Sequence, residues 1–381
     1  MIDEYEVWSY REDVQRCMRC GFCKSLCPMS EFVEWESESP RGRVQVIKGL
    51  LDSNLKANTH IMNSLYNCAL CGYCLWRCPP GVRTTDAFKA ARKYLVDSNL
   101  YPPEIDCIEG KIRKERNIYG LPNELRTEWI DLMEVSSKVP VWKKADVVYF
   151  PGCISSFSSR GISIAHSTSL ILNKMGLEWT IMGNEEWCCG NPLILAGKLE
   201  TLREIIEHNV GAVRRLEAKI LVTSCAGCYR TFIQDYPRFI GELGFEVYHI
   251  SQLMEKMDLR KFGIKINEVV TYHDPCELGR HSSVYEPPRK VLKELLGNNF
   301  IELPKSRSLA KCCGGNRVLK VTNKGLAKNL ALKRLEEVYS VGAKKLVTAC
   351  PACLLNLSDA VMEEGSEVEV LDITEVIAKA I

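Results

Sequence analysis

A pattern of five cysteines occurs twice along this chain. In each copy a single cysteine is followed, after about 35 residues, by an adjacent pair, and about 35 residues later a Cys-x2-Cys ends the pattern. The first copy consists of Cys153, Cys188, Cys189, Cys225 and Cys228, and the second of Cys276, Cys312, Cys313, Cys350 and Cys353. Chance does not place ten cysteines in this order. The pattern predicts one small domain that occurs twice and holds the same kind of centre in each copy.

The cysteines are better explained as metal ligands than as disulfides. The chain has 381 residues and 19 cysteines. Its start, Met1 to Glu6, is acidic and lacks the basic and apolar regions of a signal peptide. We therefore expect a cytoplasmic protein with reduced thiols, and any association with a membrane would be made through a partner. Cys107 lies outside the motifs, and we expect a plain buried or linker thiol there.

Composition excludes several classes of partner. The net charge is +2 and hydrophobic residues make up 46% of the chain, which is ordinary for two or three globular domains. This balance gives no reason to expect nucleic acid as a partner. No apolar run reaches the roughly 18 residues that a membrane span requires, so we expect no span of the chain's own.

Two further cysteine runs lie near the start of the chain. Each reads Cys-x2-Cys-x2-Cys-x3-Cys-Pro, which is the run of bacterial two-cluster ferredoxins. In such runs the fourth cysteine ligates the other cluster. One 4Fe-4S cluster is therefore predicted on Cys17, Cys20, Cys23 and Cys78, and a second on Cys68, Cys71, Cys74 and Cys27. A pair of zinc sites is the alternative, but zinc knuckles give no reason for the third step and the Cys-Pro end.

The N-terminal part is predicted to be mostly helical. Helical spacing of apolar residues follows Pro40 up to Leu51, and residues 85–97 also fit a helix. We predict a helical ferredoxin domain over 1–98 and a connector without chemistry over 99–144. Parts of that connector, such as Leu125 to Val135, are expected to be helical, and its basic side chains are expected to lie in solvent.

The two copies of the five-cysteine pattern predict tandem α/β domains at 145–265 and 266–381. Strands are expected before the first cysteine, before the adjacent pair and before the last pair of each copy, with helices between them. This alternation predicts parallel sheets. All the cysteines would then lie at the carboxyl ends of strands, where open α/β sheets bind their ligands.

Each copy offers more thiolates than a cubane cluster uses. A four-iron cubane takes four cysteines, whereas each copy has five. Adjacent cysteines such as Cys312 and Cys313 suit a larger or more open cluster, or a thiolate that bridges two irons. The alternative is a zinc site or an ordinary cluster with one spare cysteine.

The five-cysteine motifs, each with Cys-Cys-Gly and a final Cys-x2-Cys, resemble the CCG domain. The order of one ferredoxin and two CCG domains resembles the family formed by the D subunits of methanogen heterodisulfide reductase. Proteins with a similar layout include iron–sulfur subunits of glycolate, lactate and anaerobic glycerol-3-phosphate dehydrogenases. An iron–sulfur component of the sulfite-reduction-associated membrane complex and a component of tungsten-type benzoyl-CoA reductase share it too.

The resemblance implies two noncubane 4Fe-4S clusters, one on each set of five cysteines. It also implies a disulfide substrate, joining coenzyme M and coenzyme B, between these clusters. Electrons would arrive one at a time through the ferredoxin domain from a redox partner, either a flavoprotein or a membrane cytochrome b subunit. The chain has no glycine fingerprint for a nucleotide, so flavin or NAD would lie on that partner.

One position departs from the family. The reductases have a histidine directly after the first cysteine of the second motif, where it supplies a proton to the released thiol, whereas this chain has Glu277. Glu277 and the nearby His273 are therefore the candidate catalytic residues, with His281 as a further one. Two functions follow: a disulfide reductase subunit, favoured by the ten intact cysteines, or an electron-transfer subunit without its own substrate, favoured by Glu277.

Overall fold

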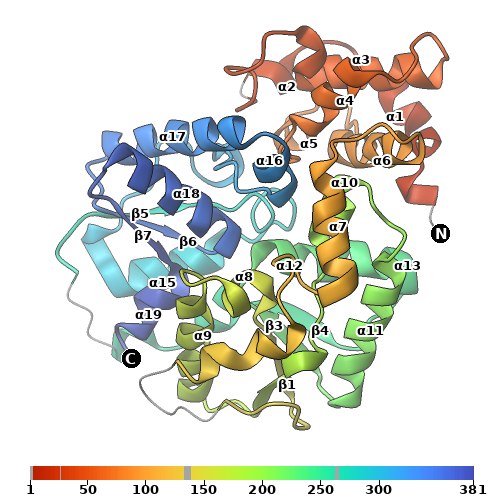
Figure 1. The fold of residues 1–381 in the computed structure, drawn as a ribbon. Helices are drawn as coiled ribbons and strands as arrows, with labels where there is room; N and C mark the ends of the chain where they lie inside the picture. Colours follow the sequence, from red (N-terminus) through yellow and green to blue (C-terminus); the bar gives the residue numbers. More distant parts are fainter. Residues whose placement is uncertain (1–2, 26, 133–138, 262–265) are drawn as a thin grey trace.

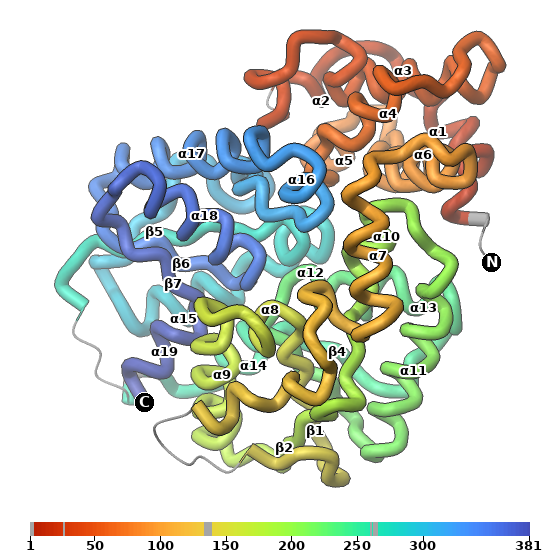
Figure 2. The backbone as a smooth tube through the Cα atoms, viewed as in Figure 1, coloured from red at the N-terminus to blue at the C-terminus, as the bar shows by residue number. Residues whose placement is uncertain are grey.

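A computed structural model describes residues 3–25, 27–132, 139–261 and 266–381. A helical N-terminal part lies across the top of two α/β units, which stand side by side (Figure 1). Figure 2 shows the same three parts as a smooth trace of the backbone. Helix α7 (Glu104–Glu115) runs from the N-terminal part down to the first α/β unit. The fold is the predicted one: a mostly helical ferredoxin-type part followed by two tandem α/β CCG units.

The N-terminal part consists of short helices around the two ferredoxin cysteine runs. The helix predicted from Pro40 to Leu51 is confirmed. It begins there because the Ser39 side chain accepts a hydrogen bond from the Gly42 N–H at 3.0 Å and Pro40 occupies the first turn. The predicted helix at 85–97 is confirmed as well. The helices are α1 Arg11–Gln15, α2 Phe22–Ser25, α3 Pro40–Leu51, α4 Thr59–Tyr66, α5 Tyr73–Trp76 and α6 Thr84–Asp97.

The first α/β unit has a four-stranded, all-parallel sheet in the order β2-β1-β3-β4. Its strands are β1 Val147–Phe150, β2 Trp179–Ile181, β3 Ile220–Thr223 and β4 Glu246–His249. Its helices are α8 Gly152–Phe157, α9 Ile162–Lys174, α10 Asn191–Ala196, α11 Leu202–Arg215, α12 Ala226–Arg230, α13 Tyr236–Ile240 and α14 Ile250–Met254.

The second unit repeats this plan with one strand fewer among the described residues. Its sheet has the order β5-β6-β7, again all parallel, and Phe300 makes only an isolated bridge with Val270 where the first unit has β2. The strands are β5 Val270–His273, β6 Lys345–Thr348 and β7 Glu369–Asp372. The helices are α15 Glu286–Leu296, α16 Arg317–Thr322, α17 Lys324–Ser340, α18 Pro351–Glu364 and α19 Ile373–Ala378.

The predicted parallel sheets are confirmed, but the sequence did not predict the edge strands β4 and β7. Each is only four residues long and runs directly into a helix that its last residue caps. The caps, His249 and Asp372, both complete a capping box, so the helix signal masked the strand before it.

The two α/β units share one hydrophobic core, which contains residues from β1, β3, β5 and β6. At their interface α9 packs on α19. Arg160, just before α9, donates to both carboxylate oxygens of Glu375 in α19, at 2.6 and 3.0 Å. The predicted boundaries at 98/99, 144/145 and 265/266 stay predictions. Residues 262–265, at the last of them, and 133–138, in the predicted connector, lie outside the described residues.

The predicted connector is partly helical, as expected. It contains α7 Glu104–Glu115 and a 3-10 helix at Asn123–Ile130. Two side chains of this second helix, Arg126 and Trp129, are buried, and Trp129 belongs to the shared core of the α/β units. The expectation that basic residues here lie in solvent is therefore wrong for Arg126.

Removing the Trp129 ring should destabilise the protein, because a fully buried indole would leave a cavity in the shared core. We expect Trp129→Ala to cost about 3–5 kcal/mol and to lower the midpoint of thermal unfolding, followed by circular dichroism under anaerobic conditions. Leu132→Ala, close by in the same connector but 63% exposed, is the matched control and should change stability by less than about 0.5 kcal/mol. Equal effects of the two substitutions would contradict this role of Trp129.

Candidate functional site: one cavity between the two CCG units

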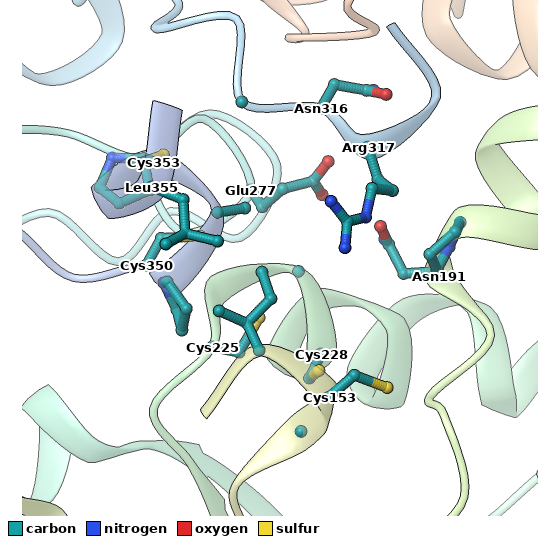
Figure 3. Close-up of a pocket in the computed structure, with 18 of the residues that line it drawn as sticks. Cys153, Asn191, Cys225, Cys228, Glu277, Asn316, Arg317, Cys350, Cys353 and Leu355 are labelled. Atoms are coloured by element: carbon teal, nitrogen blue, oxygen red, sulfur yellow. The ribbon is translucent and has the colours of Figure 1, made fainter. Parts of the chain in front are cut away.

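All ten cysteines of the two five-cysteine motifs line a single cavity between the α/β units. The cavity is partly open to solvent. Figure 3 shows Cys153, Cys225 and Cys228 on one wall and Cys350 and Cys353 on the other. The two motifs therefore face each other across one space.

The strands place these cysteines. Cys153 follows the end of β1 and Cys276 follows the end of β5. The last pairs begin at Cys225 after β3 and at Cys350 after β6, and both residues are the N-caps of the helices that follow. Because parallel strands end at the same edge of a sheet, the carboxyl ends of the central strands of both sheets meet at the cavity, as the sequence predicted for each unit.

The adjacent cysteine pairs lie on tight loops that require glycine. Gly190 and Gly314 follow the pairs and have φ of +82° and +76°. A Cβ on Gly314 would lie 2.3 Å from the Ala327 carbonyl oxygen, and one on Gly190 would lie 2.4 Å from Leu202 Cδ1. Only glycine allows both this backbone conformation and this close approach to the following helix.

Within each motif the thiols contact one another. Hydrogen bonds with Cys312 and then with Cys353 hold the pKa of the Cys313 thiol well below its usual range. In the first motif a hydrogen bond with Cys188, and a second with Cys228, lowers the pKa of Cys189 to about 6. Such closely packed, buried thiols are the ligand type that iron–sulfur clusters take, so the residues present fit such a group.

Thiol contacts also join the motifs to one another and to the N-terminal part. A hydrogen bond with Cys228, and a second with Cys350 of the other unit, lowers the pKa of Cys225. A hydrogen bond with Cys312 lowers the pKa of Cys71 to about 5. The sulfur atoms therefore form a continuous path from the second ferredoxin run, through the second CCG motif, to the first.

The fourth cysteine of each ferredoxin run lies beside the other run. Burial raises the pKa of Cys23 to about 11, and the neighbouring charges of Cys17, Cys78 and Cys20 contribute to this rise. Burial raises the pKa of Cys27 to about 12, with Cys71 and Cys68 as its neighbours. Cys78 thus lies with the first run and Cys27 with the second.

The cysteines of the two ferredoxin runs differ in their exposure to solvent. Cys68, Cys71 and Cys74 are buried beneath the helices, and Thr84 donates to Cys74 Sγ at 3.1 Å. Cys20 is exposed, and among the motif cysteines, all of which the structure describes, it is the only exposed one. Cys107 is exposed on α7, in the connector and away from these groups.

Charged side chains also reach the cavity. Glu277, Arg317 and Lys320 line it, and Figure 3 shows the polar ends of Glu277, Arg317 and Asn191 pointing toward its centre. The Glu277 carboxylate is 3.4 Å from Nη1 of the buried Arg230. Sequence reasoning missed Arg317 and Lys320, although their position directly after the Cys-Cys-Gly-Gly-Asn loop was a usable signal.

His273 lies behind the cavity wall. It ends β5, is 1% exposed, and does not line the cavity. Its ring and the Cys313 and Cys353 sulfurs offer ligand atoms that all lie within 4.8 Å of one another. His281 instead faces the N-terminal part, where its Nε2 is 2.8 Å from the Leu70 carbonyl oxygen.

A buried ion pair beside the first motif escaped the sequence analysis. Arg126 of the connector donates to Glu186 at 2.7 Å, and its Nη2 lies 4.0 Å from Cys153 Sγ. Burial raises the pKa of Glu186 to about 7. The Glu186 carboxylate also accepts from the Gly152 N–H at 3.0 Å. No local motif marks Arg126, because it lies in a segment with the composition of a charged linker.

Comparison with known families agrees with this architecture. The cysteine-rich CCG domain matches residues 147–233 and 270–358, and the 4Fe-4S dicluster domain matches residues 13–82. The chain is also 33% identical to the D subunit of the dihydromethanophenazine:CoB–CoM heterodisulfide reductase of Methanosarcina acetivorans, over 97% of this chain and 94% of that protein. The chain belongs to the family of heterodisulfide reductase D subunits. The family predicted from the sequence is therefore confirmed.

Other relatives act in different reactions. The B subunit of the fumarate reductase (CoM/CoB) of Methanothermobacter marburgensis is 28% identical over 96% of this chain and 72% of that protein. The EtfAB:quinone oxidoreductase of Syntrophomonas wolfei is 25% identical over 98% of this chain and 59% of that protein. What these relatives share is a name as a reductase or an oxidoreductase, in two cases as a subunit of one. In the described part of this chain, no helix is long and apolar enough to cross a membrane.

The glycine after each cysteine pair gives a direct test of the loop geometry. In Gly314→Ala the new methyl would collide with the Ala327 carbonyl, so we expect the second motif to lose its metal. Iron measured on anaerobically purified protein should fall by about four per chain, the content of one cluster. Gly342→Ala is the control, because Gly342 also has positive φ but nothing lies within 4 Å of its Cβ position. Full iron in Gly314→Ala would refute this account of the loop.

Proposed function

We propose that the chain is the electron-delivering and disulfide-reducing subunit of a complex. The observation that carries the proposal is that all ten CCG cysteines line one cavity. A disulfide placed there would have one sulfur near each set of thiols. The coenzyme M–coenzyme B disulfide is the first candidate, by resemblance to the D subunits of the CoB–CoM heterodisulfide reductases.

The cofactor proposal has four clusters, with the ligands predicted from the sequence. Two cubane clusters would be held by Cys17, Cys20, Cys23 and Cys78, and by Cys68, Cys71, Cys74 and Cys27. Two noncubane clusters would be held by Cys153, Cys188, Cys189, Cys225 and Cys228, and by Cys276, Cys312, Cys313, Cys350 and Cys353. When bound, these groups supply single electrons and, in the cavity, iron that can accept sulfur.

The protein itself would supply protons and orientation. Reduction follows R–S–S–R′ + 2 e⁻ + 2 H⁺ → R–SH + R′–SH, so each released thiolate needs a proton. Glu277 is the proposed donor for one of them, because its carboxyl group points into the cavity (Figure 3). Arg317 on the cavity wall favours an anionic substrate and would hold it in place.

The contacts between thiols support an order of electron flow. Electrons would enter at the exposed first group, move to the buried second group, and cross from Cys71 to Cys312. The Cys350–Cys225 contact then leads to the first CCG motif. In this order electrons would pass each of the four cysteine sets once and would reach both walls of the cavity.

The second candidate function is an electron conduit without its own substrate. Glu277 in place of the family's histidine favours it, as do relatives that carry the names of quinone and fumarate oxidoreductases. In that case a flavoprotein or membrane partner would exchange electrons with the chain, and the cavity would serve only to hold two clusters.

The decisive assay uses anaerobic protein shown to carry about 16 irons, as four four-iron clusters require. We expect this protein to reduce the coenzyme M–coenzyme B disulfide with a reduced viologen dye as electron donor. Two thiols should be released for each disulfide consumed. Full iron without turnover would contradict the reductase and leave the conduit.

Glu277 can be tested in the same assay. We expect Glu277→Gln to lower turnover about 10²–10⁴-fold while iron content stays unchanged, because an amide does not donate the proton. Glu277→His, which introduces the histidine of the reductases, should restore most of the rate. Ser282→Ala is a nearby control, since the Ser282 hydroxyl donates to the backbone carbonyl of Glu277 and leaves its carboxyl group untouched. Unaltered turnover in Glu277→Gln would exclude it as the proton donor.

Exposed apolar and cationic side chains surround Cys20 and mark where a protein partner would deliver electrons. Met18 and Phe22 are 65% and 52% exposed, and the Arg77 guanidinium lies over the Phe22 ring at 5.7 Å. Arg19 lies beside them, and its Nε donates to the neutral side chain of Gln45 at 3.0 Å. Cations around an exposed redox site favour an acidic partner.

We expect Phe22→Glu to slow reduction of the chain by a reduced, acidic bacterial ferredoxin at least severalfold. Reduction by viologen, which needs no docking surface, should be unchanged. Met362→Glu is the control, because Met362 is 78% exposed on α18, far from Cys20 in the fold. Equal slowing by both substitutions would argue against docking at Cys20.

A further inference from the structure

The two CCG motifs have identical ligand sets but different residues directly behind them. Phe150 ends β1 three residues before Cys153, and His273 ends β5 three residues before Cys276. The two side chains thus occupy equivalent positions. Phe150 is fully buried and packs edge-on against Phe232, with ring centroids 5.0 Å apart. His273 is equally buried but polar.

A second pair of equivalent positions differs in the same sense. Val210 on α11 follows Cys189 at the same interval as Arg334 on α17 follows Cys313. Val210 and Phe150 belong to one hydrophobic cluster with Cys189. Arg334 is fully buried and contacts His273. An apolar pair in the first unit is therefore replaced by a hydrogen-bonded pair in the second.

The contact between Arg334 and His273 fixes the histidine tautomer. Arg334 Nε is 3.1 Å from His273 Nδ1. A guanidinium has donors only, so Nδ1 must accept and the ring hydrogen must be on Nε2. Arg334 is itself held by Glu337 at 2.6 Å and by the Lys305 carbonyl at 2.9 Å, so it has little freedom to release the ring.

The Cys313 sulfur lies close to the remaining part of the ring. One ligand atom of His273 and the Cys313 sulfur lie within 4.8 Å of each other. With Nδ1 occupied by Arg334, the ring offers Cys313 a neutral Nε2–H. Releasing that hydrogen would leave an imidazolate, so this arrangement makes His273 a poor proton donor to a substrate. It suits a standing N–H···S hydrogen bond instead.

Direct ligation of iron by His273 is the competing interpretation of the same distances, because Cys353 completes a group of three. The first unit argues against it. There the same five cysteines are present while phenylalanine occupies the histidine position. A motif that is complete beside Phe150 needs no sixth ligand beside His273.

We propose that Arg334 and His273 form a positioning pair that donates a hydrogen bond to the Cys313 sulfur and raises the reduction potential of the second CCG site. The inference rests on the proposed cluster assignment. Reduction adds negative charge to a cluster, and hydrogen bonds to its sulfurs, together with nearby cations, stabilise that charge.

The test replaces the pair by its counterpart from the first unit. In His273→Phe/Arg334→Val, the midpoint potentials of all clusters are measured by anaerobic redox titration followed by electron paramagnetic resonance. We expect one CCG signal to move to a lower potential and the ferredoxin signals and iron content to stay unchanged. Four unchanged potentials at full iron content would overturn the proposal.

Two further variants keep the test informative if the double variant folds poorly. Arg334→Lys keeps a buried cation near Glu337 but loses the planar Nε donor, so we expect a shift in the same direction but smaller. His273→Asn keeps an N–H donor and should retain more of the wild-type potential than His273→Phe. A larger fall in potential in His273→Asn than in His273→Phe would contradict hydrogen bonding as the cause.

Spectroscopy separates the pair from a ligand. In the wild-type protein, pulsed electron paramagnetic resonance should show only weak hyperfine coupling between the second CCG cluster and a nitrogen nucleus, as expected for a hydrogen-bonded ring. Strong coupling that His273→Phe abolishes would overturn the proposal in favour of ligation. None of these readouts depends on disulfide turnover. Wild-type protein with only about eight irons would instead show that the cluster assignment of the proposed function had failed.

Discussion

The meeting of two parallel sheets at the carboxyl ends of their central strands is the constraint on which the site depends. Each of these strands ends just before a cysteine, so the packing of one unit on the other decides whether ten thiols form two distant groups or one cavity. The shared hydrophobic core and the Arg160–Glu375 ion pair hold the units in that relation. The N-terminal part closes the upper side, where Asn316 donates to the Ala69 carbonyl at 2.9 Å.

Buried charges connect the three parts of the molecule around this cavity. Lys89 of α6 faces Asp235, Asp235 pairs with Arg230, and Arg230 reaches Glu277 on the cavity wall. Burial lowers the pKa of Lys89, and although burial opposes it, the Arg230 charge lowers the pKa of Asp235. Because unpaired buried ions are costly, each of these side chains requires the next, and the chain of pairs specifies how the parts dock.

The two CCG units combine a repeated ligand frame with different surroundings. The cysteines, the glycine after each pair and the strand order recur in both. Behind the first set lie Phe150 and Val210, with the Arg126–Glu186 pair at one side; behind the second lie His273 and Arg334. Two sites with equal ligands and unequal neighbours are suited to different reduction potentials, since the hydrogen bonds and charges around the sulfurs set these.

The sequence by itself determined the local and periodic features of the protein: the two ferredoxin runs, the duplicated motif, the parallel α/β plan and helices such as Pro40–Leu51. These features follow from the spacing of residues within short segments, and this spacing can be read from the sequence. Only the tertiary structure decided that both motifs share one cavity, that Arg126 of a charged linker lies buried beside Cys153, and that Arg334 meets His273. Such contacts join residues that are far apart in the chain. They depend on burial and charge pairing when the units pack together, and no spacing within a short segment predicts them.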